Sequence, residues 1–201
     1  MPKNRVLLID ETSADAVVAQ GLVEAGYELV GCHCSVDRLR AKYLASEPEL
    51  LVLCVNKPTE GLLADIQLLS EKKAVPIVLF VDSSDPQWMK KSLKVGVSSY
   101  IYRGLEPIRI PAILEMAKLR FAQLQSLKLE LEEAQHKLQS RVLVDRAKGM
   151  LMEYQKISEQ QAYRTLQKTA MDQATTIADI ARQTIAVLSK MNINPGNALA
   201  R

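Results

Sequence analysis

The chain has 201 residues, of which 48% are hydrophobic and 24% charged, and its mean hydropathy of −0.03 is typical of a soluble globular protein with one or two domains. The longest uninterrupted apolar run, residues 74–81, is far shorter than a membrane span, and the first residues lack the pattern of a secretory signal. Three cysteines do not suggest a disulfide framework. We therefore expect a reduced, cytoplasmic protein without a membrane partner.

The net charge of +3 is unevenly distributed along the chain. Residues 1–140 contain 17 Lys and Arg against 18 Asp and Glu, whereas residues 141–201 contain 9 against 5. A basic carboxy-terminal third suits a polyanionic partner, because each phosphate contact releases counterions. Many solvated helical domains are equally basic, so charge alone does not identify the partner.

Residues 1–110 alternate short apolar runs with amphipathic stretches. The apolar runs predict strands over residues 6–9, 28–30, 50–55, 76–81 and 99–102, and the stretches between them predict helices over residues 14–25, 37–46, 62–72 and 87–95. Continuously apolar strands belong to parallel sheets that are covered on both faces. The pattern therefore predicts an α/β flavodoxin-like domain with a five-stranded parallel sheet.

This part of the chain resembles the receiver domain of two-component response regulators. Asp10 and Glu11 follow the first strand, like the family's acidic pair that holds a divalent metal. Cys54 occupies the position of the phospho-accepting aspartate, Val81 that of the hydroxyl residue and Arg103 that of the lysine. Phosphoryl transfer needs a carboxylate nucleophile, a metal, and hydroxyl and cationic groups around the phosphoryl oxygens. We therefore expect a pseudo-receiver, controlled by a protein partner or by oligomerisation instead of Asp phosphorylation.

The same residues also have purely structural interpretations. Asp10 and Glu11 suit a solvated loop before a helix N-terminus, and Cys54 suits an inert buried thiol better than a redox sensor. Residues 32–34 read Cys-His-Cys, but on a strand the histidine points away from both cysteines. We therefore expect no metal and no cofactor. No Ser/His/Asp, Cys/His or P-loop arrangement suggests an enzyme.

A long helix follows the first domain. Between Pro111 and Gly149, 37 residues contain neither Pro nor Gly and are rich in good helix formers. With Ile110 at heptad position a, the central a and d positions form an apolar seam of Leu124, Leu127, Leu131, Ala134 and Leu138. This seam predicts a coiled-coil helix over residues 111–141 and a homodimer. The alternative is a single amphipathic helix that packs on its own domain.

Residues 142–192 predict a compact unit of three helices, and residues 193–201 a flexible tail. Ser158 followed by Gln161 predicts a capping box at the start of the second helix. Apolar stripes on the second and third helices are formed by Ala162, Leu166 and Ala170, and by Ile177, Ile180, Ala181, Ile185 and Leu188. We also expect four residues in the core: Met150, Leu151, Met152 and Met171.

The ordered segments 146–152, 158–166, 170–171 and 178–181 resemble the ANTAR domain, a family of bacterial RNA-binding transcription antitermination regulators. The resemblance implies a dimer that binds paired hairpin loops in a leader transcript and prevents formation of the terminator. The domain order is most similar to regulators of nitrate and nitrite assimilation, in which a ligand-sensing protein sequesters the regulator, and next to the amidase-operon regulator. A DNA-binding response regulator is the alternative, although no helix shows the polar base-reading face expected in a major groove.

RNA hairpins are read through splayed bases, phosphates and 2′-hydroxyls, so a reader needs cations and planar side chains. The candidate contacts are Arg146, Lys148, Gly149, Tyr163, Arg164 and Lys168. The resemblance places a family lysine at Lys148, whose alternative interpretation is a solvated helix charge. Gly149 inside a helix costs about 1 kcal/mol relative to Ala, which implies that another helix or the RNA approaches the backbone closely there.

Overall fold

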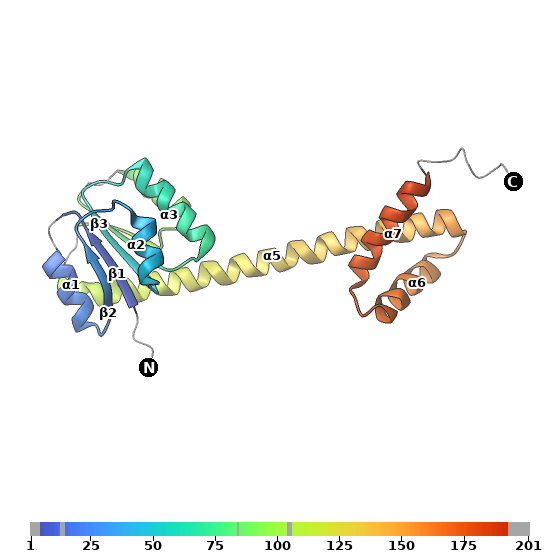
Figure 1. The fold of residues 1–201 in the computed structure, drawn as a ribbon, viewed down its shortest axis with the longest axis horizontal. Coiled ribbons are helices and arrows are strands. Elements are labelled where there is room, and N and C mark those ends of the chain that lie inside the picture. Colours follow the sequence, from blue (N-terminus) through green and yellow to red (C-terminus); the bar gives the residue numbers. More distant parts are fainter. Residues whose placement is uncertain (1–4, 13–14, 84, 104–105, 193–201) are drawn as a thin grey trace. The chain divides into compact units, whose positions relative to one another are not determined.

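The computed structural model describes residues 5–12, 15–83, 85–103 and 106–192 (Figure 1). The chain divides into two compact units, Met1–Ser126 and Leu127–Arg201. No described helix is both long enough and apolar enough to cross a membrane. The predicted tail, residues 193–201, lies outside the described residues.

The first unit contains a five-stranded parallel sheet in the order β2-β1-β3-β4-β5 (Figure 1). The strands are β1 (Arg5–Asp10), β2 (Glu28–His33), β3 (Leu50–Val55), β4 (Ile77–Val81) and β5 (Ser99–Tyr102). Every residue of β3 and β4 is buried, as continuously apolar sequences require. The predicted flavodoxin-like sheet is therefore confirmed.

Helices cover both faces of this sheet. They are α1 (Asp15–Glu24), α2 (Leu39–Ser46), α3 (Glu60–Lys72) and α4 (Pro86–Lys94), followed by a 3₁₀ turn, η1 (Pro107–Arg109). Side chains of α2 and α3 share one hydrophobic core with the sheet, while α1 and the first turns of α5 share the other. Alternate residues of β1 and β3 therefore point into different cores, which is the reason why residues 6–9 of β1 and all of β3 are apolar.

The helix α5 (Ile110–Gln155) begins in the first unit and continues without interruption into the second. Ile110 and Leu114 are fully buried against the sheet, and Gly21 of α1 makes room for Ile110, whose Cδ1 would lie 2.6 Å from a Cβ at that glycine. Tyr27 fixes the same region, because its hydroxyl donates to Glu115 at 3.0 Å and Lys118 lies over its ring at 4.5 Å. The residues predicted as a coiled coil and the first helix of the carboxy-terminal unit thus form one helix.

The second unit packs the end of α5 against α6 (Glu159–Asp172) and α7 (Ile177–Asn192). The predicted capping box is present at the start of α6, where the hydroxyl of Ser158 accepts from the backbone N–H of Gln161. Both predicted apolar stripes contribute to the shared core. Lys156 and Ala174 have positive φ at the two breaks between helices, so the three-helix prediction is confirmed.

Two methionines were wrongly predicted to lie in this core. Met171 is 75% exposed and Met152 is 37% exposed, whereas Leu151 is buried and the partly buried Met150 packs against the core. Met171 directly follows the buried Ala170, and the next residue along a helix is turned by about 100°, which carries its side chain to the surface.

Candidate functional sites

The acidic pair of the first unit, Asp10 and Glu11, accepts hydrogen bonds from neighbouring loop residues. One carboxylate oxygen of Asp10, Oδ1, accepts from the backbone N–H and the hydroxyl of Thr12, at 2.7 and 2.6 Å. Glu11 accepts from the backbone N–H of Val36 at 2.8 Å. The other oxygen of Asp10 is buried without a hydrogen-bond partner, but the family's third carboxylate is replaced here by Cys54. Among the described residues, no three His, Cys, Asp or Glu side chains are grouped to hold a metal ion, so the residues do not fit the metal of a receiver.

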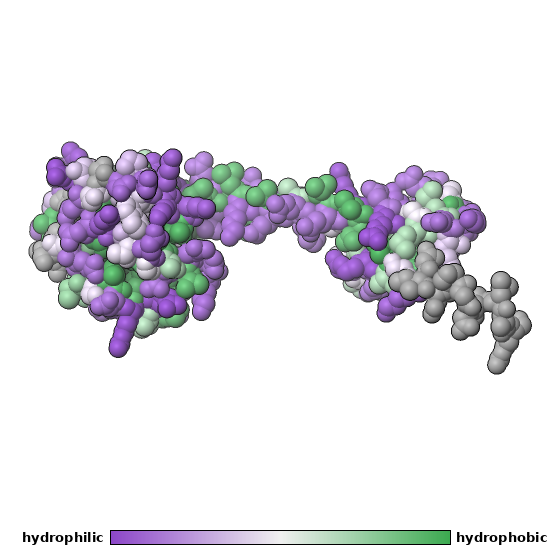
Figure 2. All heavy atoms as spheres, turned by 90° about the horizontal axis from the view of Figure 1, so that it is seen from above, coloured by the Kyte–Doolittle hydropathy of each residue, from purple (hydrophilic) through white to green (hydrophobic). Residues whose placement is uncertain are grey.

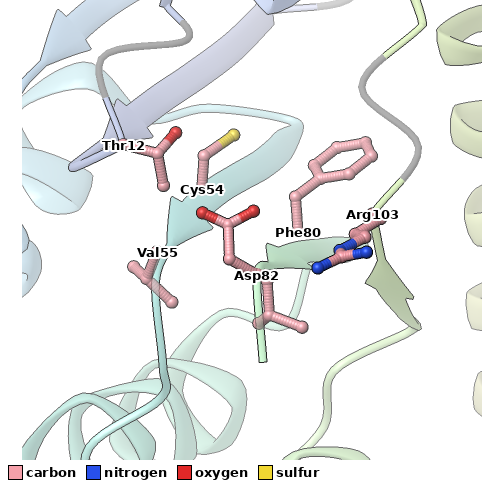
Figure 3. Close-up of a pocket in the computed structure, with 7 residues that line it drawn as sticks. Thr12, Cys54, Val55, Phe80, Asp82 and Arg103 are labelled. Carbon is pink, nitrogen blue, oxygen red and sulfur yellow. The ribbon is translucent and has the colours of Figure 1, made fainter. Parts of the chain in front are cut away.

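Cys54, Val81 and Arg103, the replaced phosphotransfer positions, come together at the carboxyl ends of the strands. They line a small cavity of about 170 Å³ together with Thr12, Val55, Phe80 and Asp82 (Figure 3). Cys54 is fully buried on β3. The three positions singled out by the resemblance thus lie around one cavity, whereas Asp82 and Thr12 were not among them, because they lie in loops whose course depends on the folded sheet.

The second unit contains the six candidate RNA contacts, three on α5 and three on α6. Arg146 and Gly149 are exposed on α5. Arg164 and Lys168 are exposed on α6 and lie one turn apart, which suits neighbouring phosphates. Tyr163 lies on α6 with 43% of its surface exposed. Arg146, Arg164 and Lys168 form no ion pair with any residue that the structure describes.

Lys148 differs from the other cations, because it joins two helices. Its Nζ lies 2.7 Å from Asp145 Oδ1, on α5, and 2.7 Å from Glu159 Oε1, in the first turn of α6. Hydrogen bonds to Asp145 and then Glu159 hold the pKa of Lys148 well above its ordinary value. Only 16% of its side chain is exposed. The geometry makes Lys148 a bridge between α5 and α6, and this bridge was not anticipated from the sequence.

Gly149 has open space above its Cα. A Cβ built there would meet nothing within 4 Å among the described atoms outside its own stretch of helix. The suggestion that another helix of the same unit packs closely against Gly149 is therefore wrong. Gly149 lies on the same side of α5 as Leu138 and Val142, which precede it by eleven and seven residues.

The predicted seam is exposed on α5. Its four leucines, Leu124, Leu127, Leu131 and Leu138, are between 54% and 64% exposed, and Ala134 is exposed as well. Hydrophobic residues are visible along one side of this helix in Figure 2. The seam is therefore exposed within each of the two units as far as the structure describes them, and pairing through it stays a prediction.

Comparison with known proteins finds a family model that matches the carboxy-terminal part of the chain. The family model "ANTAR domain" matches residues 132–185, which include the end of α5, all of α6 and the first half of α7. Transcriptional regulatory protein PdtaR of Mycobacterium tuberculosis is 27% identical over 190 residues, which cover 94% of this chain and 92% of that protein. Nitrate regulatory protein of Klebsiella oxytoca is 32% identical over 83 residues, but these cover only 41% of this chain and 21% of that protein.

Solved structures match the first unit in fold. The receiver domain of a modulated diguanylate cyclase from Desulfovibrio desulfuricans has a TM-score of 0.52 and 16% identity, and covers 60% of this chain and 98% of that one. The receiver domain of the putative response regulator NarL from Mycobacterium tuberculosis has a TM-score of 0.50 and 18% identity, and covers 58% and 97%. These likenesses establish a receiver fold for the first unit.

Proposed function

We propose that this protein, an ANTAR-domain protein with an amino-terminal domain of receiver fold, is an RNA-binding transcription antitermination regulator. The observation that carries the proposal is the ANTAR match over residues 132–185, which coincides with the basic helical unit of the chain. The similarity to the transcriptional regulator PdtaR extends over both domains and supports the same role. In this role the protein binds paired hairpin loops of a leader transcript and prevents formation of the terminator.

Three exposed cations contact the RNA phosphates in this proposal. Arg164 and Lys168 on α6 and Arg146 on α5 are free of internal ion pairs among the described residues, so binding RNA breaks no salt bridge at these positions. Cations that release counterions in this way dominate affinity for nucleic acids and make it salt-dependent. Lys148 contributes through the position of α6 instead, since its ammonium group is already bound by two carboxylates.

The active form in this proposal is a homodimer paired through α5. Four half-exposed leucines on one side of a helix favour a hydrophobic partner, because burying a leucine completely contributes about 1.5–3 kcal/mol. A second copy presents the same stripe and also doubles the RNA-binding surface, as recognition of paired hairpins needs.

The last part of the proposal is that binding of another protein, and not phosphorylation of an aspartate, regulates the activity. Cys54 stands where phosphotransfer needs a carboxylate, and Val81 and Arg103 replace the accompanying hydroxyl and lysine in the same cavity. We therefore infer that a ligand-sensing protein regulates the chain by binding it. A narrower proposal is that the sensor's ligand is nitrate or nitrite. It is supported by the short similarity to the nitrate regulatory protein.

A gel-shift comparison tests the function. The probes are a two-hairpin RNA with randomised loops, a one-hairpin RNA from the same pool, and duplex DNA of the same sequences. We expect the two-hairpin RNA to bind most tightly and the duplex DNA to bind weakly. Preferential binding of the duplex DNA would instead favour a DNA-binding response regulator. Incubation with acetyl phosphate, followed by mass spectrometry, tests the control: a stable gain of one phosphoryl group would contradict it.

A further inference from the structure

Three helices of the second unit surround a hollow of about 370 Å³. Its lining residues come from α5 and α6 and from the first turn of α7: Ser140, Arg141, Val144, Asp145, Lys148, Tyr163 and Ile177. The volume lies at the lower end of the range for small-molecule pockets, which is roughly 300–1,000 Å³. Of these residues, only Lys148 and Tyr163 were expected from the sequence to contact RNA.

The lining of the hollow carries charges of both signs. Asp145 contributes a carboxylate, and the nearest ammonium group, that of Lys148, is already shared between Asp145 and Glu159 at 2.7 Å each. An anion placed here would meet one carboxylate directly and compete with two for the lysine, and only the guanidinium of Arg141 is a cation of the lining that pairs with no described carboxylate. A neutral group that both donates and accepts hydrogen bonds can use Ser140, Arg141 and Asp145 together, whereas an anion can use only the donors.

The lining also suits a flat group with a polar edge. Val144 and Ile177 supply apolar surface, and the half-exposed ring of Tyr163 supplies a face on which a planar ring can stack. The hydroxyl of Ser140, the guanidinium of Arg141 and the carboxylate of Asp145 supply donors and acceptors. A nucleobase has this combination of a stacking face and a hydrogen-bonding edge.

We propose that this hollow receives one unstacked nucleobase of an RNA loop, which stacks on Tyr163 between α5, α6 and α7. The inference rests on the proposed RNA-binding function and adds to it a site for a base, separate from the cations that contact phosphates. Lys148 is a positioning residue in this site, because its two ion pairs hold α6, and with it Tyr163, against α5.

A double-mutant cycle between protein and RNA tests the site. The protein variants are Tyr163→Ala and Tyr163→Phe, and the RNA is a two-hairpin probe taken from the randomised pool, with one loop nucleotide at a time made abasic. Stacking of a base on an aromatic ring changes affinity by about 5-fold to about 100-fold, so we expect Tyr163→Ala to weaken binding within that range. Tyr163→Phe keeps the ring and should bind like the wild type. At one loop position the abasic change should cost the wild type as much as Tyr163→Ala does, and cost the Ala variant nothing more.

Two controls separate this site from general surface effects. Tyr154 is another half-exposed tyrosine of the same unit that does not line the hollow, and Tyr154→Ala should leave affinity unchanged. In the wild type, 2-aminopurine at the coupled loop position should change its fluorescence on binding, which requires no variant to fold.

The outcomes distinguish the site from the function. If the wild type binds the hairpins but Tyr163→Ala and the abasic changes are additive at every loop position, the base site is overturned and the function stands. If Tyr163→Ala alters self-association and not RNA affinity, a second protomer fills the hollow, and the base site is again overturned. If the wild type prefers duplex DNA, the function and the base site fail together.

Discussion

Replacing Gly149 by alanine should stabilise the second unit and weaken its binding to RNA. Gly149 lies inside α5, six residues before the helix ends, and a Cβ there would meet no described atom within 4 Å outside its own stretch of helix. Glycine in a helix interior is less favourable than alanine by about 1 kcal/mol, and open space means that no packing cost offsets this gain. The folded protein therefore keeps a destabilising residue at a position where its own packing does not need one.

The gain in stability can be measured for each unit separately. For a unit of 60–100 residues, about 1 kcal/mol raises Tm by roughly 4–8 °C. Far-UV circular dichroism follows the melting of the helices, whereas Trp88, the only tryptophan, lies in the first unit and reports on that unit by fluorescence. We expect Gly149→Ala to raise the transition of the second unit and to leave the Trp88 transition unchanged.

Binding to the two-hairpin RNA should fall in the same variant. If an RNA group approaches the backbone at Gly149, the added methyl group prevents about one hydrogen bond, which corresponds to a loss of about fivefold in affinity. Gly61→Ala is the matched control, because Gly61 is also exposed and helical and its Cβ would have only Thr59 Oγ1 nearby, at 3.9 Å. A variant at Gly149 that is more stable and binds RNA with unchanged affinity would refute the proposed contact.

Four further variants test the other assignments. Lys148→Met should weaken RNA binding but leave the slope of log affinity against log salt unchanged, whereas Arg164→Gln should make that slope shallower by about 0.7, as the loss of one single-strand phosphate contact does. Leu131→Asp should shift the protein from dimer to monomer in sedimentation, with a loss of at least about 100-fold, because two leucines of about 1.5 kcal/mol each leave the seam. Tyr27→Phe should lower the free energy of unfolding by up to about 1 kcal/mol near neutral pH. The hydrogen bonds that Tyr27 and Lys118 donate to Glu115 lower the pKa of its carboxyl group. The difference in unfolding free energy between the wild type and Tyr27→Phe should therefore be complete above the ordinary carboxyl pKa of 4.5 and disappear as the pH falls through the lowered pKa. Urea titrations over this pH range measure it.

The parts of the fold that the sequence predicted correctly are those specified by short-range patterns. Every residue of β3 is apolar, and that run alone indicates a strand covered on both faces. The capping box joins Ser158 to Gln161, three residues later, and the apolar stripe of α6 recurs every four residues from Ala162 to Ala170. Both patterns lie within about two helical turns. Such patterns need no knowledge of the tertiary structure, because each one specifies a local conformation and the face that it buries.

The role of Lys148 could not be predicted in this way. Its partner Glu159 follows eleven residues later, beyond the break at Lys156, so their contact depends on the angle at which α6 returns to α5. The hollow beside Tyr163 depends even more on tertiary structure, since Ile177 of α7 and Arg141 of α5 are 36 residues apart. One signal for the hollow was present: Arg141 interrupts the apolar d positions of the predicted seam, and a cation at such a position marks the end of the pairing face.

The tertiary contacts also change what the charge of residues 141–201 means. Their nine basic and five acidic residues suggest a broadly cationic surface, but Lys148 is neutralised by two carboxylates and Arg182 pairs with Asp179 at 2.7 Å. Six cations of residues 141–192 pair with no described carboxylate, which is the lower end of the six to ten phosphate contacts of strongly salt-dependent nucleic-acid binders: Arg141, Arg146, Lys156, Arg164, Lys168 and Lys190. Stacking of a base together with duplication of the module adds to the affinity that these cations supply. An RNA-binding protein of this kind distinguishes hairpins by the loop bases that it can accommodate more than by their charge. The choice between competing hairpins of a transcript requires such discrimination.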